Sequence, residues 1–140
     1  MQGRVVAAHG RHFVIEDDEG CRLIAHPRGK RSDCVVGDVV NWQPTQGDDR
    51  SQGVIESVQP RRNLLFRQDE WRTKSFAANL DAVLMVVAGY PLFSETQLTR
   101  ALIAAAQAGI EAGIVLNKID RPEVEAARST LEPYRRMGIS

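Results

Sequence analysis

Residues 110–120 read IEAGIVLNKID, and this stretch decides the fold of the second half of the chain. Its first part, 110–116, is mostly apolar and includes β-branched residues, which is typical of a strand buried in a parallel sheet. Its last four residues, 117–120, follow that strand directly. In a doubly wound sheet, ligands bind at the carboxyl ends of the strands, so this tetrapeptide is a candidate binding site.

The sequence around this strand alternates between strand and helix patterns. Residues 82–88 (AVLMVVA) form a second continuous apolar run, which we expect to be a strand buried on both faces. Helices are expected at about 95–108, with Ser94 as N-cap, and at about 122–137. This order predicts a parallel sheet with a right-handed crossover. Because two strands cannot bury the apolar faces of both helices, residues 80–140 are expected to be part of a larger α/β domain.

The residue types in Asn117-Lys118-Ile119-Asp120 suit a guanine base. The carboxylate of Asp120 can accept two hydrogen bonds, from the ring N1–H and the exocyclic amine of guanine, and adenine does not offer that pair. The apolar stem of Lys118 can lie against the base. Asn117 can brace the neighbouring loops. The motif therefore predicts a guanine-nucleotide site.

A purely structural role for Asp120 is the alternative. Asp120 could be the N-cap of the following helix, with Pro122 at an early helical position and Glu123 completing a capping box. The two interpretations are compatible at this stage, because one carboxylate oxygen can cap the helix while the site awaits a nucleotide.

Residues 1–60 show a different pattern, in which short apolar strands are separated by turn residues. This spacing predicts a small closed barrel of the OB type, because closure removes exposed strand edges. Residues 61–79 lack clean periodicity and are expected to be a linker. The strands are expected at 3–8, 11–16, 21–25, 35–42 and 53–58.

Charge, hydropathy and cysteine spacing restrict the classes of function that the sequence allows. The formal net charge is +0, so binding to a polyanion must come from local patches. No apolar run is long enough for a transmembrane helix, and residues 1–8 lack the core of a signal peptide, so we expect a cytoplasmic protein. A zinc site built from Cys21, Cys34, His26 and His9 or His12 matches no usual ligand spacing. The two cysteines are therefore expected to be reduced.

The phosphate-binding loop of GTPases, GxxxxGK[ST], is absent from the sequence. That loop normally precedes an Asn-Lys-x-Asp strand, yet residues 1–79 have a β-barrel pattern. Either the chain is not a GTPase, or its GTPase domain is circularly permuted and the phosphate loop lies beyond Ser140.

Several segments, in this order, resemble the RsgA family of circularly permuted GTPases, and the resemblance covers essentially the whole chain. Together they are far more specific than the tetrapeptide alone. The segments are 21–30, 36–40 (VGDVV), 53–56 (GVIE), 60–63 (PRRN), 78–81 (ANLD) and 114–120 (IVLNKID).

The resemblance implies an OB-fold domain, a permuted GTPase domain beginning near residue 80 and a C-terminal zinc-binding domain. It also implies a monomeric protein that hydrolyses GTP with Mg²⁺ during late maturation of the small ribosomal subunit. This chain departs from the family pattern by ending at Ser140, before the phosphate loop, the magnesium ligands and the zinc ligands. We therefore expect no catalytic or metal-ligating residue in these 140 residues, and no GTP turnover by the chain alone.

Basic residues gather in two segments, 22–31 in the barrel and 61–74 in the linker, and in the linker they are interleaved with Phe66 and Trp71. Such a mixture suits contact with an RNA backbone together with base stacking. A solvated charged face is the plainer alternative, and a non-catalytic RNA-binding module is the alternative to the GTPase. The candidates for contact with ribosomal RNA are Arg22, Arg28, Lys30, Arg31, Arg61, Arg62, Arg67 and Trp71.

Overall fold

The computed structural model describes residues 1–29, 33–46, 49–68 and 70–140. These residues form two compact units, Met1–Leu80 and Asp81–Ser140. Lys30 and Arg31, two of the candidates for RNA contact, lie outside the described residues. In the part of the chain that is described, no helix has the length and apolar character needed to cross a bilayer.

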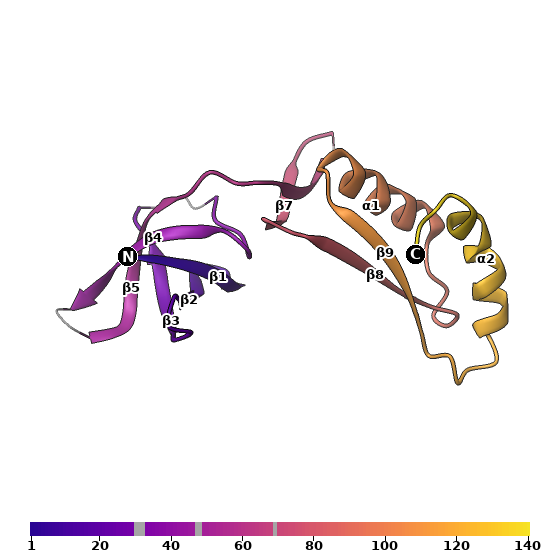
Figure 1. Cartoon of the computed structure of the whole chain (residues 1–140), viewed down its shortest axis with the longest axis horizontal. Coiled ribbons are helices and arrows are strands. Elements are labelled where there is room, and N and C mark those ends of the chain that lie inside the picture. The colour runs from indigo at the N-terminus through magenta and orange to yellow at the C-terminus, as the bar shows by residue number, and fades with distance from the viewer. Residues whose placement is uncertain (30–32, 47–48, 69) are drawn as a thin grey trace. The chain divides into compact units, whose positions relative to one another are not determined.

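Five strands of the first unit close into a barrel in the order β1-β2-β3-β5-β4 (Figure 1). Neighbouring strands are antiparallel, except that β3 and β5 are parallel. This is the OB-fold barrel that the strand spacing predicts. The strands are β1 (Gln2–His9), β2 (His12–Asp17), β3 (Arg22–Pro27), β4 (Val39–Gln46) and β5 (Asp49–Val58).

The barrel core follows from the alternation of apolar and polar residues along the strands. Val5, Ile15 and Val40 are completely buried, and Trp42 is only 1% exposed. Side chains at alternate positions of a strand point to the same face, so each strand contributes one inward row. Burial of each large apolar side chain stabilises the fold by about 1.5–3 kcal/mol.

The fourth strand begins at Val39 and not at residue 35, because residues 35–38 form a turn. The backbone N–H of Val35 donates to the side chain of Asp38, and the N–H of Asp38 donates to the carbonyl of Val35. Gly37 has a φ of +94°, which favours glycine. The apolar run VVGDVV conceals this turn in the sequence.

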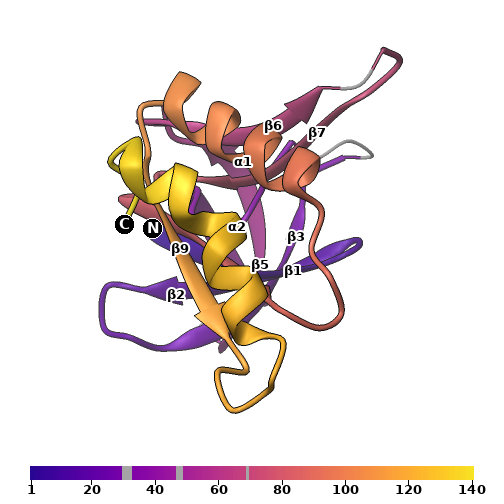
Figure 2. The same ribbon diagram turned by 90° about the vertical axis from the view of Figure 1, so that its right-hand side faces the viewer.

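Residues 61–79, expected to be a linker, contain an antiparallel hairpin (Figure 2). Its strands are β6 (Leu64–Gln68) and β7 (Thr73–Ala78). The N–H of Ala78 donates to the carbonyl of Val36, which ties the hairpin to the barrel. Periodicity does not reveal the hairpin, because most of its residues are exposed or half-buried and a bulge shifts the register after Leu65.

The second unit has the order β8 (Ala82–Ala88), α1 (Glu95–Gln107), β9 (Glu111–Asn117) and α2 (Val124–Arg136). The strands β8 and β9 are parallel neighbours, with Ala82 opposite Glu111, as the sequence predicts. Ser94 caps α1 by accepting a hydrogen bond from the N–H of Gln97, which confirms the expected helix start.

Both helices pack on one face of this two-stranded sheet. Leu98 of α1, Tyr134 of α2 and Val87 of β8 form the buried centre, and Met85 and Ile114 pack against it. The expected burial of β8 on both faces is wrong for this chain, since Leu84 and Val86 are 65% and 64% exposed. Within the unit 81–140, no element covers that face of the sheet.

Replacement of Gly37 by alanine is expected to destabilise the barrel unit by about 2 kcal/mol or more. The added Cβ would overlap the carbonyl oxygen of Ala78, in a backbone conformation that already disfavours alanine. Gly10→Ala is the matched control, because Gly10 also has a positive φ, +66°, but nothing lies within 4 Å of its added Cβ. Urea unfolding of both variants measures the difference, and equal losses would contradict the proposed overlap.

Candidate functional site

The Asn-Lys-x-Asp motif lies at the carboxyl end of β9. Asn117 is the last residue of that strand and is paired with Ala88, the last residue of β8. The loops that follow the two parallel strands therefore leave the sheet at the same edge. This is the edge at which open α/β sheets bind ligands.

Lys118 is held in an uncommon conformation. Its φ is +54°, a left-handed value that few residues other than glycine adopt. Its ammonium donates to the carbonyl of Tyr90 at 3.2 Å, which joins the motif to the loop after β8. Such local strain is frequent at ligand sites, where the surrounding structure maintains it.

Gly89 allows the two loops to approach closely. A Cβ added at this position would lie 2.5 Å from the carbonyl oxygen of Glu123 and 2.7 Å from its carbonyl carbon. Both atoms belong to the backbone, so they cannot turn aside as a flexible side chain could. Only glycine therefore fits at this position without displacing the backbone of Glu123. Sequence reasoning missed this residue, although a glycine directly after an apolar strand is a usable signal.

Asp120 is not the cap of α2, so the helix-cap interpretation is wrong. The helix begins at Val124, its N-cap residue is Glu123, and the side chain of that residue makes no capping hydrogen bond. Asp120 instead lies in a turn in which the N–H of Arg121 donates to the carbonyl of Lys118. The helix therefore does not begin near Pro122, as the sequence predicts, because this turn occupies residues 118–121.

The side chains of Asn117 and Asp120 are both exposed. Neither makes a hydrogen bond or ion pair to any residue in the described ranges 1–29, 33–46, 49–68 and 70–140. The Asp120 carboxylate therefore has both oxygens available as acceptors. A pair of adjacent N–H donors, such as the Watson–Crick edge of guanine presents, matches that arrangement.

Ligands for a metal ion do not gather at this motif. Within the described ranges, the one group of three close metal-ligating side chains is Asp17, Glu19 and Cys21, which belongs to the barrel unit. The residues at the motif thus fit the base of a nucleotide and do not fit its phosphates or a magnesium ion.

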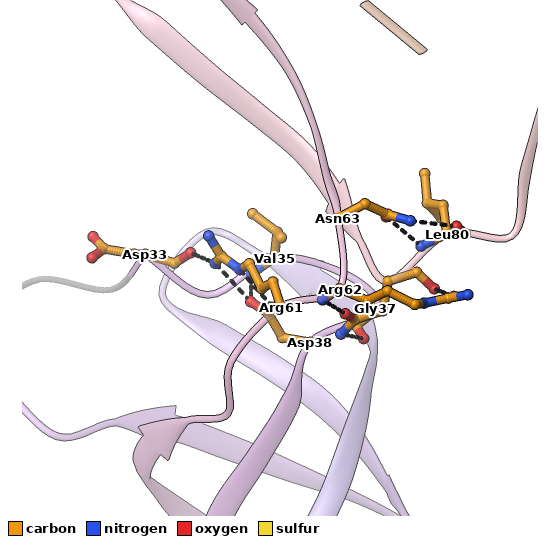
Figure 3. A network of polar contacts seen from close by, with 9 residues as sticks. Asp33, Val35, Gly37, Asp38, Arg61, Arg62, Asn63 and Leu80 are labelled. Atoms are coloured by element: carbon orange, nitrogen blue, oxygen red, sulfur yellow. Dashed lines mark hydrogen bonds and ion pairs between the residues drawn. The ribbon is translucent and has the colours of Figure 1, made fainter. Parts of the chain in front are cut away.

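Arg61, a candidate for RNA contact, is engaged in a structural ion pair (Figure 3). Its Nε lies 2.8 Å from Oδ1 of Asp38 and its Nη2 lies 2.9 Å from Oδ2, in a bidentate arrangement. Asp38 is fully buried, and Nη2 of Arg61 also donates to the carbonyl of Asp33. The hydrogen bond with Asp38 raises the pKa of Arg61 above its ordinary value.

The buried pair also affects the neighbouring thiol. Burial, together with the charge of Asp38, raises the pKa of Cys34 to about 12. Cys34 is buried and Cys21 is exposed, and no disulfide joins them. They form no close metal-ligating group with the histidines in the described part of the chain. Sequence reasoning gave Asp38 no role, although an aspartate within the apolar run VVGDVV signals a buried partner.

Two asparagines connect this network to the hairpin. Oδ1 of Asn79 accepts from the N–H of Arg62 at 2.7 Å, and Nδ2 of Asn79 donates to the carbonyl of Gly37. The side chain of Asn63 exchanges two hydrogen bonds with the backbone of Leu80 (Figure 3). Nη2 of Arg62 donates to the carbonyl of Asn79. Arg61 and Arg62 therefore both fix the start of the hairpin.

The remaining candidates for RNA contact fall into two groups. Arg22 and Arg28 lie on the barrel and form exposed ion pairs with Glu16 and Glu56, at 3.0 and 3.2 Å. Arg67 and Trp71 lie on the hairpin β6–β7, where Trp71 is 90% exposed. Arg67 and Trp71 thus lie on the hairpin itself, whereas the side chains of Arg61 and Arg62 connect the hairpin to the barrel.

Comparison with known proteins agrees with the motif and the barrel. The family model described as RsgA GTPase matches residues 58–140. A protein of Variovorax paradoxus named "Small ribosomal subunit biogenesis GTPase RsgA" is 57% identical over 136 residues, covering 96% of this chain and 42% of the relative. Proteins of the same name from Paraburkholderia xenovorans and Bordetella pertussis are 52% and 51% identical, each over 99% of the chain.

The chain spans less than half the length of these relatives, between 42% and 45%. The family match includes β8, β9 and the whole Asn-Lys-x-Asp motif. The relatives match along nearly the whole chain, barrel included. The chain belongs to the RsgA GTPase family.

Proposed function

We propose that this chain supplies the OB-fold barrel and the guanine-binding half of a longer GTPase that acts in biogenesis of the small ribosomal subunit. The names of the relatives support the activity and the partner. The exposed carboxylate of Asp120 carries the nucleotide part of the proposal, because it lies at the carboxyl end of β9 and the helix cap is at Glu123.

In this proposal each residue of the motif has a separate role. Asp120 accepts hydrogen bonds from N1–H and the exocyclic amine of guanine. The stem of Lys118 lies against the base while the carbonyl of Tyr90 holds its ammonium. Asn117 braces the edge of the site. Phosphate binding, Mg²⁺ and hydrolysis depend on residues beyond this chain, so the 140-residue chain alone should bind GDP feebly and turn over no GTP.

The proposal also places the protein in the cytoplasm as a monomer bound to the small subunit and its ribosomal RNA. The hairpin β6–β7 supports an RNA contact, because it combines the exposed ring of Trp71 with the exposed cations Arg67, Arg72 and Lys74. Bases stack on exposed aromatic rings, and cations contact the phosphates. The ion pairs of Arg22 and Arg28 are exposed and weak, so phosphate groups can replace their partners.

Asp120→Asn tests the base site in the full-length protein. The change replaces one acceptor by a donor, so GTP affinity should fall at least about tenfold, since an unpaired polar group costs about 1–3 kcal/mol. Xanthosine triphosphate should then bind better than GTP, because it carries a carbonyl where guanine has an amine. Glu123→Gln is the control, since the Glu123 side chain makes no capping bond. Titration with fluorescent nucleotides measures the affinities of each variant for GTP and xanthosine triphosphate. An unchanged preference for GTP in Asp120→Asn would refute the base site.

Gly89→Ala tests whether close contact of the two loops positions the motif. The added Cβ would strike the backbone of Glu123, so the segment 117–123 must shift, and GTP affinity should fall at least about tenfold. Gly113→Ala is the matched control in β9, because its added Cβ meets Cδ2 of Leu84 at 3.1 Å, and that exposed side chain can move. If both variants bind GTP equally well in the same titration, Gly89 does not position the site.

Two changes in the hairpin separate stacking from phosphate contact. Trp71→Ala should weaken binding to small ribosomal subunits by about 1–3 kcal/mol without changing its salt dependence, because no charge is lost. Arg72→Gln should lower the slope of log affinity against log salt by about one. Arg128→Gln on α2 is the control for loss of an arginine that lies outside the hairpin. Co-sedimentation with small ribosomal subunits at several salt concentrations measures the affinity and its salt dependence. If both hairpin variants bind like the unaltered protein, the RNA contact lies elsewhere.

A further inference from the structure

The three histidines of the chain lie in one row on the outer face of the barrel. His9 ends β1 and is paired with His12, the first residue of β2. The register of β2 with β3 pairs Phe13 with Ala25, and this places His12 opposite His26. Because Phe13 and Ala25 point into the core, their neighbours on the strands point outward. Three adjacent strands thus present three imidazoles side by side.

The ring spacing fits shared binding of one ion. The ring centroids of His9 and His12 are 5.4 Å apart, and those of His12 and His26 are 6.1 Å apart. Two imidazoles on one tetrahedral ion have centroids about 5 Å apart, because each metal–nitrogen bond is about 2.0–2.1 Å long. His9 and His12 already have that spacing. His9 and His26 flank His12 on opposite sides, and both are exposed, so both side chains must turn towards His12 to share one ion.

The surroundings leave the imidazole nitrogens available. In the described part of the chain, none of the three histidine side chains makes a hydrogen bond or an ion pair. The next outward row of the barrel is apolar, with Val14 opposite Ile24. Two charged pairs lie along the barrel near this row. Glu16 and Arg22, beyond the apolar row, are paired at 3.0 Å, and Arg28, two residues after His26, is paired with Glu56 at 3.2 Å.

A second group of donors on the barrel is explained without an ion. The donor atoms of Asp17, Glu19 and Cys21 lie within 4.8 Å of one another, closer together than those of the three histidines as they stand. Oδ1 of Asp17, however, accepts from the backbone N–H groups of Glu19 and Cys21, at 3.0 and 2.8 Å. This cluster therefore forms the turn between β2 and β3, whereas the histidine row has no structural role of that kind.

We propose that His9, His12 and His26 form a surface site for a divalent transition-metal ion, with His12 as the central ligand. Neutral imidazole is a preferred ligand of Zn²⁺, Ni²⁺ and Cu²⁺. The ion draws the two outer rings towards His12, and three protein ligands leave a further coordination position open. The site lies on the barrel, near the proposed RNA contacts Arg22 and Arg28, and it shares no residue with them or with the proposed nucleotide site.

Calorimetric titration of the 140-residue chain with Zn²⁺ at neutral pH tests this site. One equivalent should bind, and His12→Asn should weaken the binding at least about tenfold, because it removes the ligand shared by both neighbours. The double variant His9→Asn/His26→Asn should lose binding to a similar extent, since it leaves a single imidazole. Thermal unfolding of each variant checks that the barrel remains folded, as expected for outward-facing positions.

Cys21→Ser is the matched control, because it removes a ligand from the acidic turn at the other end of β2 and β3 and leaves the histidines in place. Its zinc affinity should equal that of the unaltered chain. Three outcomes would overturn the proposal: no binding of Zn²⁺ by the unaltered chain, full affinity in the folded His12→Asn variant, or loss of affinity in Cys21→Ser.

Discussion

The carboxylate of Asp38 is fully buried, and the guanidinium of Arg61 balances its charge through two hydrogen bonds. Removal of one partner from such a pair costs about 3–5 kcal/mol, since it leaves a buried charge without a counter-ion. Asp38 also closes the turn that starts β4, by accepting from the N–H of Val35. Arg61 leads directly into the hairpin. One ion pair therefore links the closure of the barrel to the placement of β6 and β7.

Because of this ion pair, the basic residues of the chain differ in their freedom to bind RNA. If Arg61 turned to bind an RNA phosphate, the buried carboxylate of Asp38 would lose its counter-ion. The ion pairs of Arg22 and Arg28 are exposed, so these arginines can exchange partners at little cost in free energy. The hairpin, anchored at its base by Asn79, carries Trp71 in an exposed position. A hydrogen-bonded base and an exposed aromatic side chain suit recognition of a partner better than an unstructured linker does, because less conformational entropy is lost on binding.

In the second unit, the placement of the loops depends on backbone geometry and not on an ion pair. Parallel pairing of β8 and β9 brings the loops after both strands to one edge, and Gly89 lets them touch. Lys118 then adopts its left-handed backbone and reaches the carbonyl of Tyr90. Asp120 remains exposed without an internal partner in the described part of the chain. The edge of the sheet thus carries the residues of the proposed base site, while no element of the unit 81–140 covers the face of the sheet that carries Leu84 and Val86.

The sequence by itself determined the features that depend on near neighbours along the chain. Periodicity and turn residues predicted the barrel strands, the parallel strands β8 and β9, and the Ser94 cap, because each depends on local propensity and spacing. Tertiary structure alone decided the partner of Arg61, the hairpin in residues 61–79 and the alignment of the three histidines. These features join residues far apart in sequence, or depend on the register between strands, and no local pattern records such contacts.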